Sequence, residues 1–174
     1  MNQYGLNPAW YISALGLVWD AALKITKVQL ELLSDPYMLL MIQRGIRGGI
    51  ATISHHHGKA NNEYMGTEFD PTKDSKFISY LDANNLYGWT MSKQLPTSGF
   101  EWMTDDELDE WKHLSCILEV DLEYPEQLHK LHNDYPLVSE RVKIGNVDKL
   151  IPNLNNMTNY VVHYEHLKLY ESLG

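Results

Sequence analysis

One stretch of the chain, CILEVDLEYP, restricts the possible folds more than any other. Apolar and acidic residues alternate along it: Leu118, Val120, Leu122 and Tyr124 are separated by Glu119, Asp121 and Glu123. Successive side chains of a strand point to opposite faces, so this period-2 pattern predicts a β-strand over residues 117–124 with one buried and one solvated face. The fold must therefore place this strand between a core and solvent.

Two further runs are rich in β-forming residues. FISYLDA covers residues 77–83, and YVVHY covers residues 160–164. The three β-patterned runs are separated by loops and a helical pattern, which favours an α+β fold over a purely helical one. We expect residues 77–83, 117–124 and 160–164 to form one antiparallel sheet.

Caps and turns place the helices. Pro36 follows Asp35, an N-cap residue, and Gly45 follows an apolar stretch, so a short helix is predicted from Pro36 to Gly45. Thr104 and Glu107 form a capping-box pattern for a helix that runs to about Lys112. The final run EHLKLYESLG can begin another helix, while residues 55–76 are polar and predict a long surface connection.

Composition narrows the class of protein only slightly. The chain has 174 residues, 44% of them hydrophobic, which is enough for a folded core. No apolar run is long enough to span a bilayer, and the first residues lack the pattern of a signal peptide, so we expect an intracellular protein without a membrane segment. The single cysteine, Cys116, is interpreted as a core residue.

The net charge of −9 argues against nucleic-acid binding, because phosphate contacts normally need lysine and arginine. Much of the acid lies in one stretch, EWMTDDELDEWK, which a solvated helix face explains. His55, His56 and His57 are adjacent, so their side chains diverge and do not converge on one metal ion.

Asp82 stands where the run 77–83 ends, and two asparagines follow it at Asn84 and Asn85. A carboxylate at the edge of a core needs a partner, a hydrogen bond or a metal ion. Aspartate followed by asparagines is also ordinary turn chemistry, because these side chains bond nearby backbone amides. The residues alone leave both interpretations open.

The stretch YLDANNLYGWTM, residues 80–91, resembles motif A of family B DNA polymerases, usually written D-x-x-S-L-Y-P. It is most similar to the protein-primed branch found in viruses, organellar plasmids and Polinton-type transposons, which commonly carries the wording D-x-N-N-L-Y-G-W. Asp82 matches the metal-binding aspartate, and Leu86 and Tyr87 match the Leu-Tyr pair. Asn85 replaces the usual serine and Gly88 the usual proline.

Two other regions resemble the same branch in the same order. GIRGG, residues 45–49, is similar to the Y-x-G-G segment that links exonuclease and polymerase regions, with Ile46 in place of tyrosine. Residues 122–137 and 152–170 look like the region after motif A, where an insertion contacts the terminal protein. The resemblance thus implies a linking segment at 1–50, and at 51–174 a partial palm with the start of that insertion.

The resemblance implies nucleotidyl transfer with two Mg²⁺ ions, on a DNA template and primer, with deoxynucleoside triphosphates and a terminal-protein primer as partners. Asp82 would be the catalytic residue that bridges both ions, and the Ala83 carbonyl would be a further ligand. Asn85 and Leu86 would shape the nucleotide pocket, with Tyr87 excluding a 2′-hydroxyl. The residues implied in DNA binding are Arg47, Gly48 and Gly49.

Several family patterns do not occur before Gly174. These are the D-T-D hairpin, the K-x-x-x-N-S-x-Y-G helix and the exonuclease carboxylate motifs. We therefore expect an incomplete, palm-like antiparallel sheet with flanking helices, part of a DNA-directed DNA polymerase and inactive alone. Two alternatives stay open: a non-catalytic nucleic-acid-binding remnant, and a decayed structural remnant of a mobile element.

Overall fold

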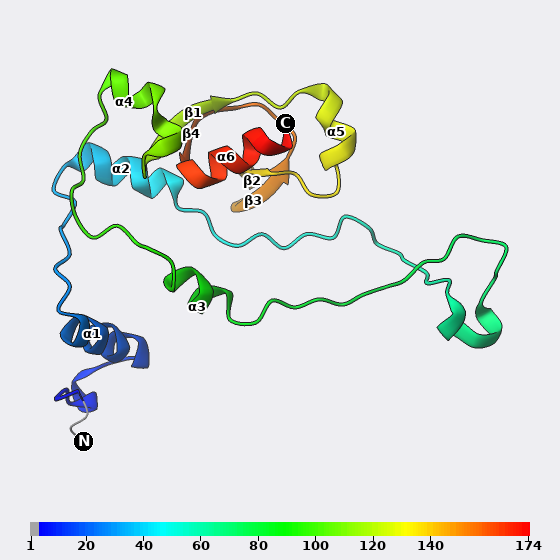
Figure 1. The fold of residues 1–174 in the computed structure, drawn as a ribbon, viewed down its shortest axis with the longest axis horizontal. Helices are drawn as coiled ribbons and strands as arrows, with labels where there is room; N and C mark the ends of the chain where they lie inside the picture. The colour runs from blue at the N-terminus through cyan, green and yellow to red at the C-terminus, as the bar shows by residue number, and fades with distance from the viewer. Residues whose placement is uncertain (1–3) are drawn as a thin grey trace. The chain divides into compact units, whose positions relative to one another are not determined.

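The computed structural model describes residues 4–174, which divide into two compact units. Unit 1 consists of the residues up to Pro36 together with Asn85–Met103, and unit 2 consists of Tyr37–Asn84 and Thr104–Gly174. Figure 1 follows the chain through both units in colour. Within residues 4–174, no helix is both long and apolar enough to cross a membrane.

Unit 1 is helical. It contains the 3₁₀ turn η1 (Pro8–Trp10), α1 (Ala14–Thr26) and α3 (Leu86–Met91). Ser13 begins α1 because its side chain accepts a hydrogen bond from the Gly16 amide, and Lys27 ends it in a left-handed conformation with φ 55°.

Hydrogen bonds join the two sequence segments of unit 1. The Glu31 amide donates to the Thr97 carbonyl at 2.8 Å, and the Gly99 amide donates to Glu31 Oε2 at 2.6 Å. The indole of Trp102 donates to the Asp35 carboxylate at 2.8 Å. Ala21 is the one buried hydrophobic residue of this unit within the described chain.

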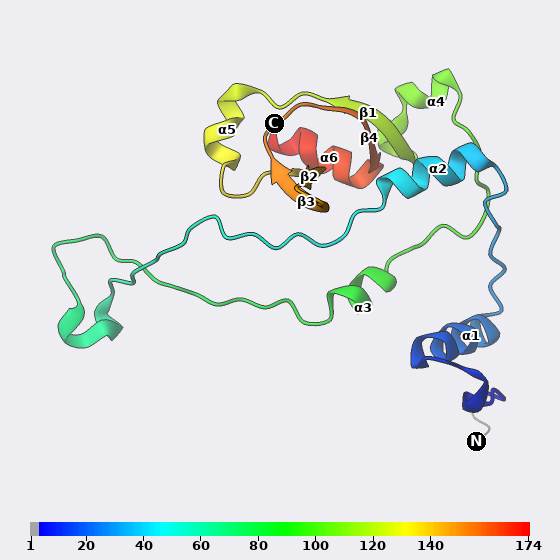
Figure 2. The same cartoon turned by 180° about the vertical axis from the view of Figure 1, so that it is seen from behind.

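Unit 2 contains the sheets. β1 (Ile117–Leu122) pairs antiparallel with β4 (Met157–His163), and β2 (Val138–Ile144) pairs antiparallel with β3 (Val147–Asn153). The helices and 3₁₀ turns are α2 (Pro36–Gly45), η2 (Glu63–Glu68), α4 (Asp105–Asp109), η3 (Trp111–His113), α5 (Glu126–His132) and α6 (Tyr164–Leu173). Figures 1 and 2 show α6 lying beside β1 and β4.

The core of unit 2 is centred on β4. Its buried hydrophobic residues are Leu118, Tyr124, Val138, Met157, Tyr160, Val161, Val162 and Leu167. Val161 is only 2% exposed, and α2 approaches it so closely that a Cβ at Gly45 would lie 2.9 Å from its Cγ1. Glycine at the end of α2 therefore lets the helix pack against β4.

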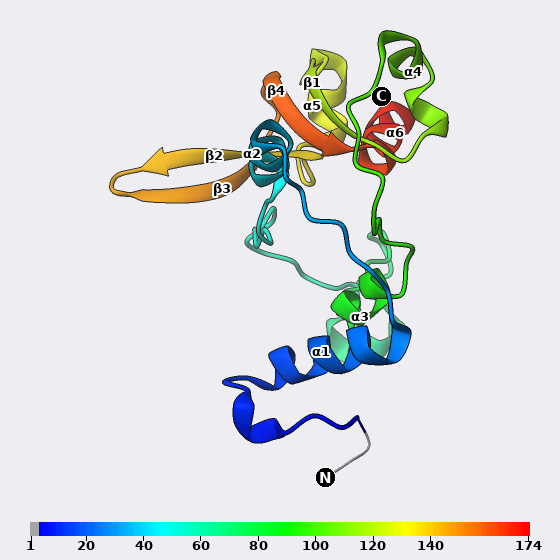
Figure 3. The same ribbon diagram turned by 90° about the vertical axis from the view of Figure 1, so that its left-hand side faces the viewer.

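β2 and β3 form a hairpin that projects away from β1 and β4 (Figure 3). Gly145 and Asn146 connect the strands, and Gly145 has φ 62° at the position where a type II′ turn needs glycine. Arg141 anchors the hairpin by donating to the Ile46 carbonyl at 3.3 Å. The sequence analysis did not predict this hairpin.

Several sequence predictions are confirmed. The chain is a mixed α+β protein with small antiparallel sheets. The alternating run predicted at 117–124 forms β1, which ends at Leu122, and the run 160–164 forms the end of β4, where Tyr164 already begins α6. The helix from Pro36 to Gly45 is present, and the capping box of Thr104 and Glu107 begins α4. This helix ends at Asp109, short of the predicted Lys112, and the 3₁₀ turn η3 follows it.

The predicted strand at residues 77–83 is wrong. A single bridge joins Asn61 and Lys76, and no strand follows it. Four apolar side chains of the run are largely exposed: Phe77 64%, Ile78 67%, Tyr80 92% and Leu81 88%. A strand needs a neighbour for its backbone and cover for its side chains, and residues 4–174 provide neither here. Of the predicted three-stranded sheet only the pair β1–β4 is present, and the pair β2–β3 lies outside that prediction.

Candidate functional site

Asp82 lies near the end of the extended segment 77–83, in unit 2. Its side chain is exposed, and its carboxylate forms no hydrogen bond or ion pair with the described residues. Ala83 follows, also exposed. The carboxylate is therefore accessible to an external ligand, and neither a local turn nor a neighbouring cation occupies it.

Asn85 begins α3 in unit 1. Its backbone is left-handed, with φ 53°, and its Oδ1 accepts a hydrogen bond from the Gly88 amide at 3.2 Å. A Cβ at position 88 would collide with the Asn85 side chain. The turn interpretation thus applies to this asparagine, whose side chain caps a helix.

This contact links the two departures from the motif A pattern. A proline at position 88, as in the motif A pattern, has no amide hydrogen to donate, whereas Gly88 supplies the donor for Asn85. The asparagine at 85 and the glycine at 88 therefore act as a pair in starting α3.

Leu86 and Tyr87 form the first turn of α3. Both side chains are exposed, Leu86 by 59% and Tyr87 by 86%. The predicted site residues therefore belong to two units. Asp82 and Ala83 lie in unit 2, and residues 85–87 lie in unit 1.

The resemblance implies bound Mg²⁺, and the ligand atoms that these residues offer are of the right chemical type, although they are few. Mg²⁺ prefers oxygen ligands, and the Asp82 carboxylate and Ala83 carbonyl are of that type. In the part of the chain that the structure describes, no group of three histidine, cysteine or acidic side chains is placed to hold a metal ion. The oxygen atoms that Asp82 and Ala83 offer are thus two possible ligands for such an ion.

Arg47 follows α2 and is held against β4. Its Nη1 donates to the Val161 carbonyl at 2.7 Å and to the Gly45 carbonyl at 3.2 Å. Its guanidinium carbon lies 3.7 Å from the centre of the Tyr160 ring, within the range of a cation–π contact. The side chain is half-buried, whereas Gly48 and Gly49 are exposed with open space around them.

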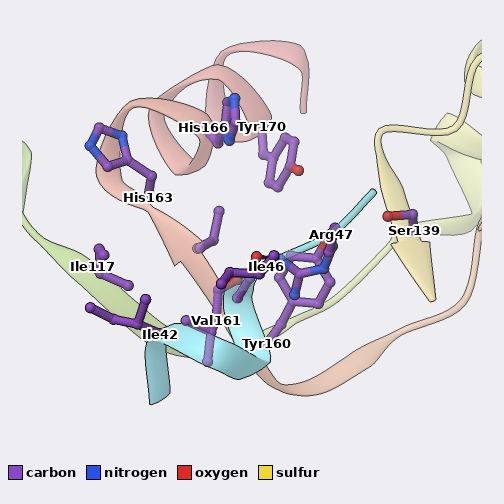
Figure 4. Close-up of a pocket in the computed structure, with 12 residues that line it drawn as sticks. Ile42, Ile46, Arg47, Ile117, Ser139, Tyr160, Val161, His163, His166 and Tyr170 are labelled. Carbon is purple, nitrogen blue, oxygen red and sulfur yellow. Dashed lines mark hydrogen bonds between the residues drawn. The ribbon is translucent and has the colours of Figure 1, made fainter. Parts of the chain in front are cut away.

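A pocket of about 430 Å³ opens beside Arg47 in unit 2 (Figure 4). Its apolar wall comes from α2, β1 and β4. Its polar side chains are an arginine, a serine, two tyrosines and two histidines. The full lining is Ile42, Gly45, Ile46, Arg47, Ile117, Ser139, Tyr160, Val161, Val162, His163, His166 and Tyr170.

Burial controls the protonation of two pocket residues. It raises the pKa of Tyr170 to about 12, with the neighbouring Tyr160 adding to the rise and Arg47 opposing it. Burial also lowers the pKa of His163, a shift that His166 reinforces and Glu165 opposes. The lowered pKa favours the uncharged form of His163 near neutral pH, and the raised pKa of Tyr170 matters only in alkaline solution.

The sequence analysis named Arg47 but not the residues that surround it. Ser139, Tyr160 and Tyr170 belong to β2, β4 and α6, and only the folding of unit 2 brings them to one pocket. Neither their spacing nor any local motif marks them. His55, excluded as a metal ligand, pairs with Asp134 at 2.9 Å.

We compared the chain with models of protein families, with curated proteins and with solved structures. None of the three comparisons returned a significant match.

Proposed function

We propose that the chain is part of a family B DNA polymerase of the protein-primed branch and carries its motif A. The observation that carries the proposal is the run Asp82 to Tyr87, in which an accessible carboxylate is followed at once by a capped helix bearing an exposed tyrosine. The division into a linking segment at 1–50 and a partial palm at 51–174 belongs to this proposal.

The proposed chemistry is nucleotidyl transfer from a deoxynucleoside triphosphate to a primer on a DNA template. Two Mg²⁺ ions, when bound, would activate the primer hydroxyl and stabilise the leaving group. Asp82 and the Ala83 carbonyl would supply oxygen ligands, with the second carboxylate provided by protein outside residues 4–174. Asn85 and Leu86 would border the nucleotide, and Tyr87 would exclude a 2′-hydroxyl.

The exposed run before Asp82 supports an incomplete palm. Phe77, Ile78, Tyr80 and Leu81 have the side chains of a buried strand yet are largely exposed. A neighbouring strand and a covering layer from additional protein would bury them. The proposed complete enzyme supplies both.

The test is a graft. Residues 77–91 replace motif A in a complete protein-primed polymerase, and primer extension is measured with deoxy- and ribonucleotides. We expect extension that requires Mg²⁺, and we expect Tyr87→Val to lower the preference for deoxynucleotides at least about tenfold, because the ring no longer blocks the 2′-hydroxyl. Trp89→Val, a change to an exposed ring on the same helix, is the matched control. An unchanged preference in Tyr87→Val would remove Tyr87 from the site.

The 174-residue chain alone should not extend primers at any practical Mg²⁺ concentration, because one carboxylate binds Mg²⁺ weakly and cannot hold two ions. Extension by this chain that disappears in Asp82→Ala would show that the site is more complete than we propose.

A second candidate is a non-catalytic nucleic-acid-binding remnant. It is favoured by the exposed backbone of Gly48 and Gly49, which a phosphate can approach, next to an arginine fixed on β4. Such a protein binds single-stranded DNA with or without Mg²⁺, with a shallow salt dependence that reflects few phosphate contacts. A decayed structural remnant, the third possibility, binds no DNA under either condition.

A further inference from the structure

The pocket beside Arg47 has the features of a site for a small ligand. Its volume of about 430 Å³ lies in the range of roughly 300–1,000 Å³ that is usual for such sites. Its wall is apolar, with isoleucines from α2 and β1 and valines from β4. A few polar groups converge on it, which is the arrangement that fixes the orientation of a bound molecule.

Arg47 offers an unused hydrogen-bonding edge at this pocket. Its Nη1 donates to two backbone carbonyls and its ring contact with Tyr160 fixes the plane of the guanidinium. Its Nε and Nη2 groups make no hydrogen bond within residues 4–174. These two groups form a parallel pair of donors, the geometry that a carboxylate accepts.

The pocket is lined by residues that can be positively charged, and no Asp or Glu is among its lining residues. The chain carries 23 acidic residues and a net charge of −9, yet no acidic residue lines this pocket. Three lining residues can be cationic, Arg47, His163 and His166, and burial keeps His163 neutral near pH 7.

Two phenol groups add neutral donors. Tyr160 is buried and Tyr170 extends from α6 toward it (Figure 4). The Tyr170 hydroxyl, like that of an ordinary tyrosine, is protonated near neutral pH, so it can donate a hydrogen bond without adding negative charge.

We propose that this pocket binds an organic monocarboxylate with an apolar or aromatic body, whose carboxylate pairs with the Nε and Nη2 edge of Arg47 and whose body lies on the isoleucines and valines. This binding is independent of nucleotidyl transfer and does not require Asp82 or Mg²⁺. The acidic chain disfavours a polyanion, whereas a single carboxylate matches the one fixed positive charge.

The test is calorimetric titration of the full 174-residue chain with 2-naphthoate, with the uncharged 2-naphthamide and with inorganic phosphate. We expect 2-naphthoate to bind at one site, and at least about tenfold more tightly than 2-naphthamide, because a charge-assisted bidentate pair is lost in the amide. Phosphate lacks the apolar body and should bind more weakly than the carboxylate. Equal affinity for carboxylate and amide, or no binding of 2-naphthoate, overturns the proposal.

Matched variants assign the site. Arg47→Gln should weaken 2-naphthoate binding at least about tenfold, and Tyr170→Phe by about threefold to tenfold, since each removes donors from the pocket. Arg44→Gln is the control: it makes the same change in charge on α2, at an exposed pair with Glu119 outside the pocket, and should bind normally. Equal losses in Arg44→Gln and Arg47→Gln would contradict the assignment.

Two controls keep the result interpretable. Thermal unfolding shows whether each variant folds, and the comparison of carboxylate with amide on the unaltered chain needs no variant at all. A short single-stranded DNA is added as a competitor. If it displaces 2-naphthoate, the pocket holds a nucleic-acid phosphate and the proposal of a small-molecule site is overturned.

Discussion

β1 and the segment 77–83 both carry β-forming side chains, and only β1 has a partner strand. In β1, Leu118 faces Val162 of β4, and both are buried. In the segment 77–83, Tyr80 and Leu81 are almost fully exposed. The difference shows that β propensity describes a surface that suits a sheet, while the strand itself needs a second strand to receive its hydrogen bonds.

The comparison also separates stability from function. The residues of β1 and β4 hold unit 2 together, whereas the accessible Asp82 contributes no described contact to it. If the segment 77–83 serves catalysis in a larger enzyme, changes there should alter activity more than folding, and changes in β4 should do the reverse.

The largest effect is expected from Asp82→Ala in a complete polymerase that carries residues 77–91. If Asp82 holds the metal ions as proposed, its loss removes several kcal/mol of transition-state stabilisation, so nucleotide incorporation should fall by roughly three orders of magnitude or more. DNA binding by the enzyme should change little. Single-turnover incorporation and DNA affinity are the two measurements.

The same substitution in the 174-residue chain is the control. Because Asp82 is exposed and unpaired, we expect the free energy of unfolding to change by less than about 0.5 kcal/mol. Near-normal incorporation by the Asp82→Ala enzyme, or marked destabilisation of the short chain, would contradict the assignment.

The second prediction compares the two regions directly. Val161→Ala should lower the free energy of unfolding of unit 2 by about 2 kcal/mol, since Val161 is 2% exposed and its loss leaves a cavity beside α2. Ile78→Ala, at 67% exposure, should change it by less than about 0.5 kcal/mol. Urea unfolding followed by circular dichroism measures both, and equal effects would mean that segment 77–83 is packed in solution.

Local signals in the sequence were sufficient for much of unit 2. The alternation that ends at Tyr124, the proline and glycine at the ends of α2, and the capping box of Thr104 and Glu107 each depend on neighbours in sequence. The β2–β3 hairpin had a similar signal, Gly145-Asn146 between β-branched residues, which the analysis did not use.

The rest depends on contacts distant in sequence. The exposure of the segment 77–83 follows from a missing partner, which no residue of the segment reveals. The pocket joins Arg47 to Tyr160 and Tyr170, more than a hundred residues later. Apolar–polar alternation and helix caps predict where individual strands and helices form. They do not predict which strands and helices pack against one another.

The third prediction concerns the pocket side of β4 and the pH dependence of stability. Tyr170 has a pKa raised from 10.0 to about 12 in the folded chain, so between these values the unfolded state loses a proton that the folded state keeps. Stability should therefore fall as pH rises from 10 to 12, with a contribution from Tyr170 of about 1 kcal/mol, because solvent screens this partly exposed side chain.

Tyr170→Phe removes this contribution, so its free energy of unfolding should depend less steeply on pH above 10 than that of the unaltered chain. Tyr135→Phe is the matched control, because Tyr135 is 78% exposed. Urea unfolding at a series of pH values measures all three proteins, and parallel curves for the unaltered chain and Tyr170→Phe would mean that the hydroxyl is solvated.

The smallest effect is expected in α3, at the two positions where the chain departs from the usual motif A. Asn85 caps the helix by accepting from the Gly88 amide at 3.2 Å, so Asn85→Ser and Gly88→Pro each disturb the same hydrogen bond. Proline at 88 removes the amide donor, so a serine at 85 then breaks no further hydrogen bond. The shorter serine side chain also clashes less with the proline ring than asparagine does. The double variant should therefore lose less unfolding free energy than the sum of the losses of the single variants, by about 0.5–1 kcal/mol.

The measurement is a double-mutant cycle on thermal unfolding of the 174-residue chain, with Asn84→Ser in place of Asn85→Ser as the control for a neighbouring asparagine. Additive effects at 85 and 88 would show that the two positions are not energetically coupled, and that the cap does not link them.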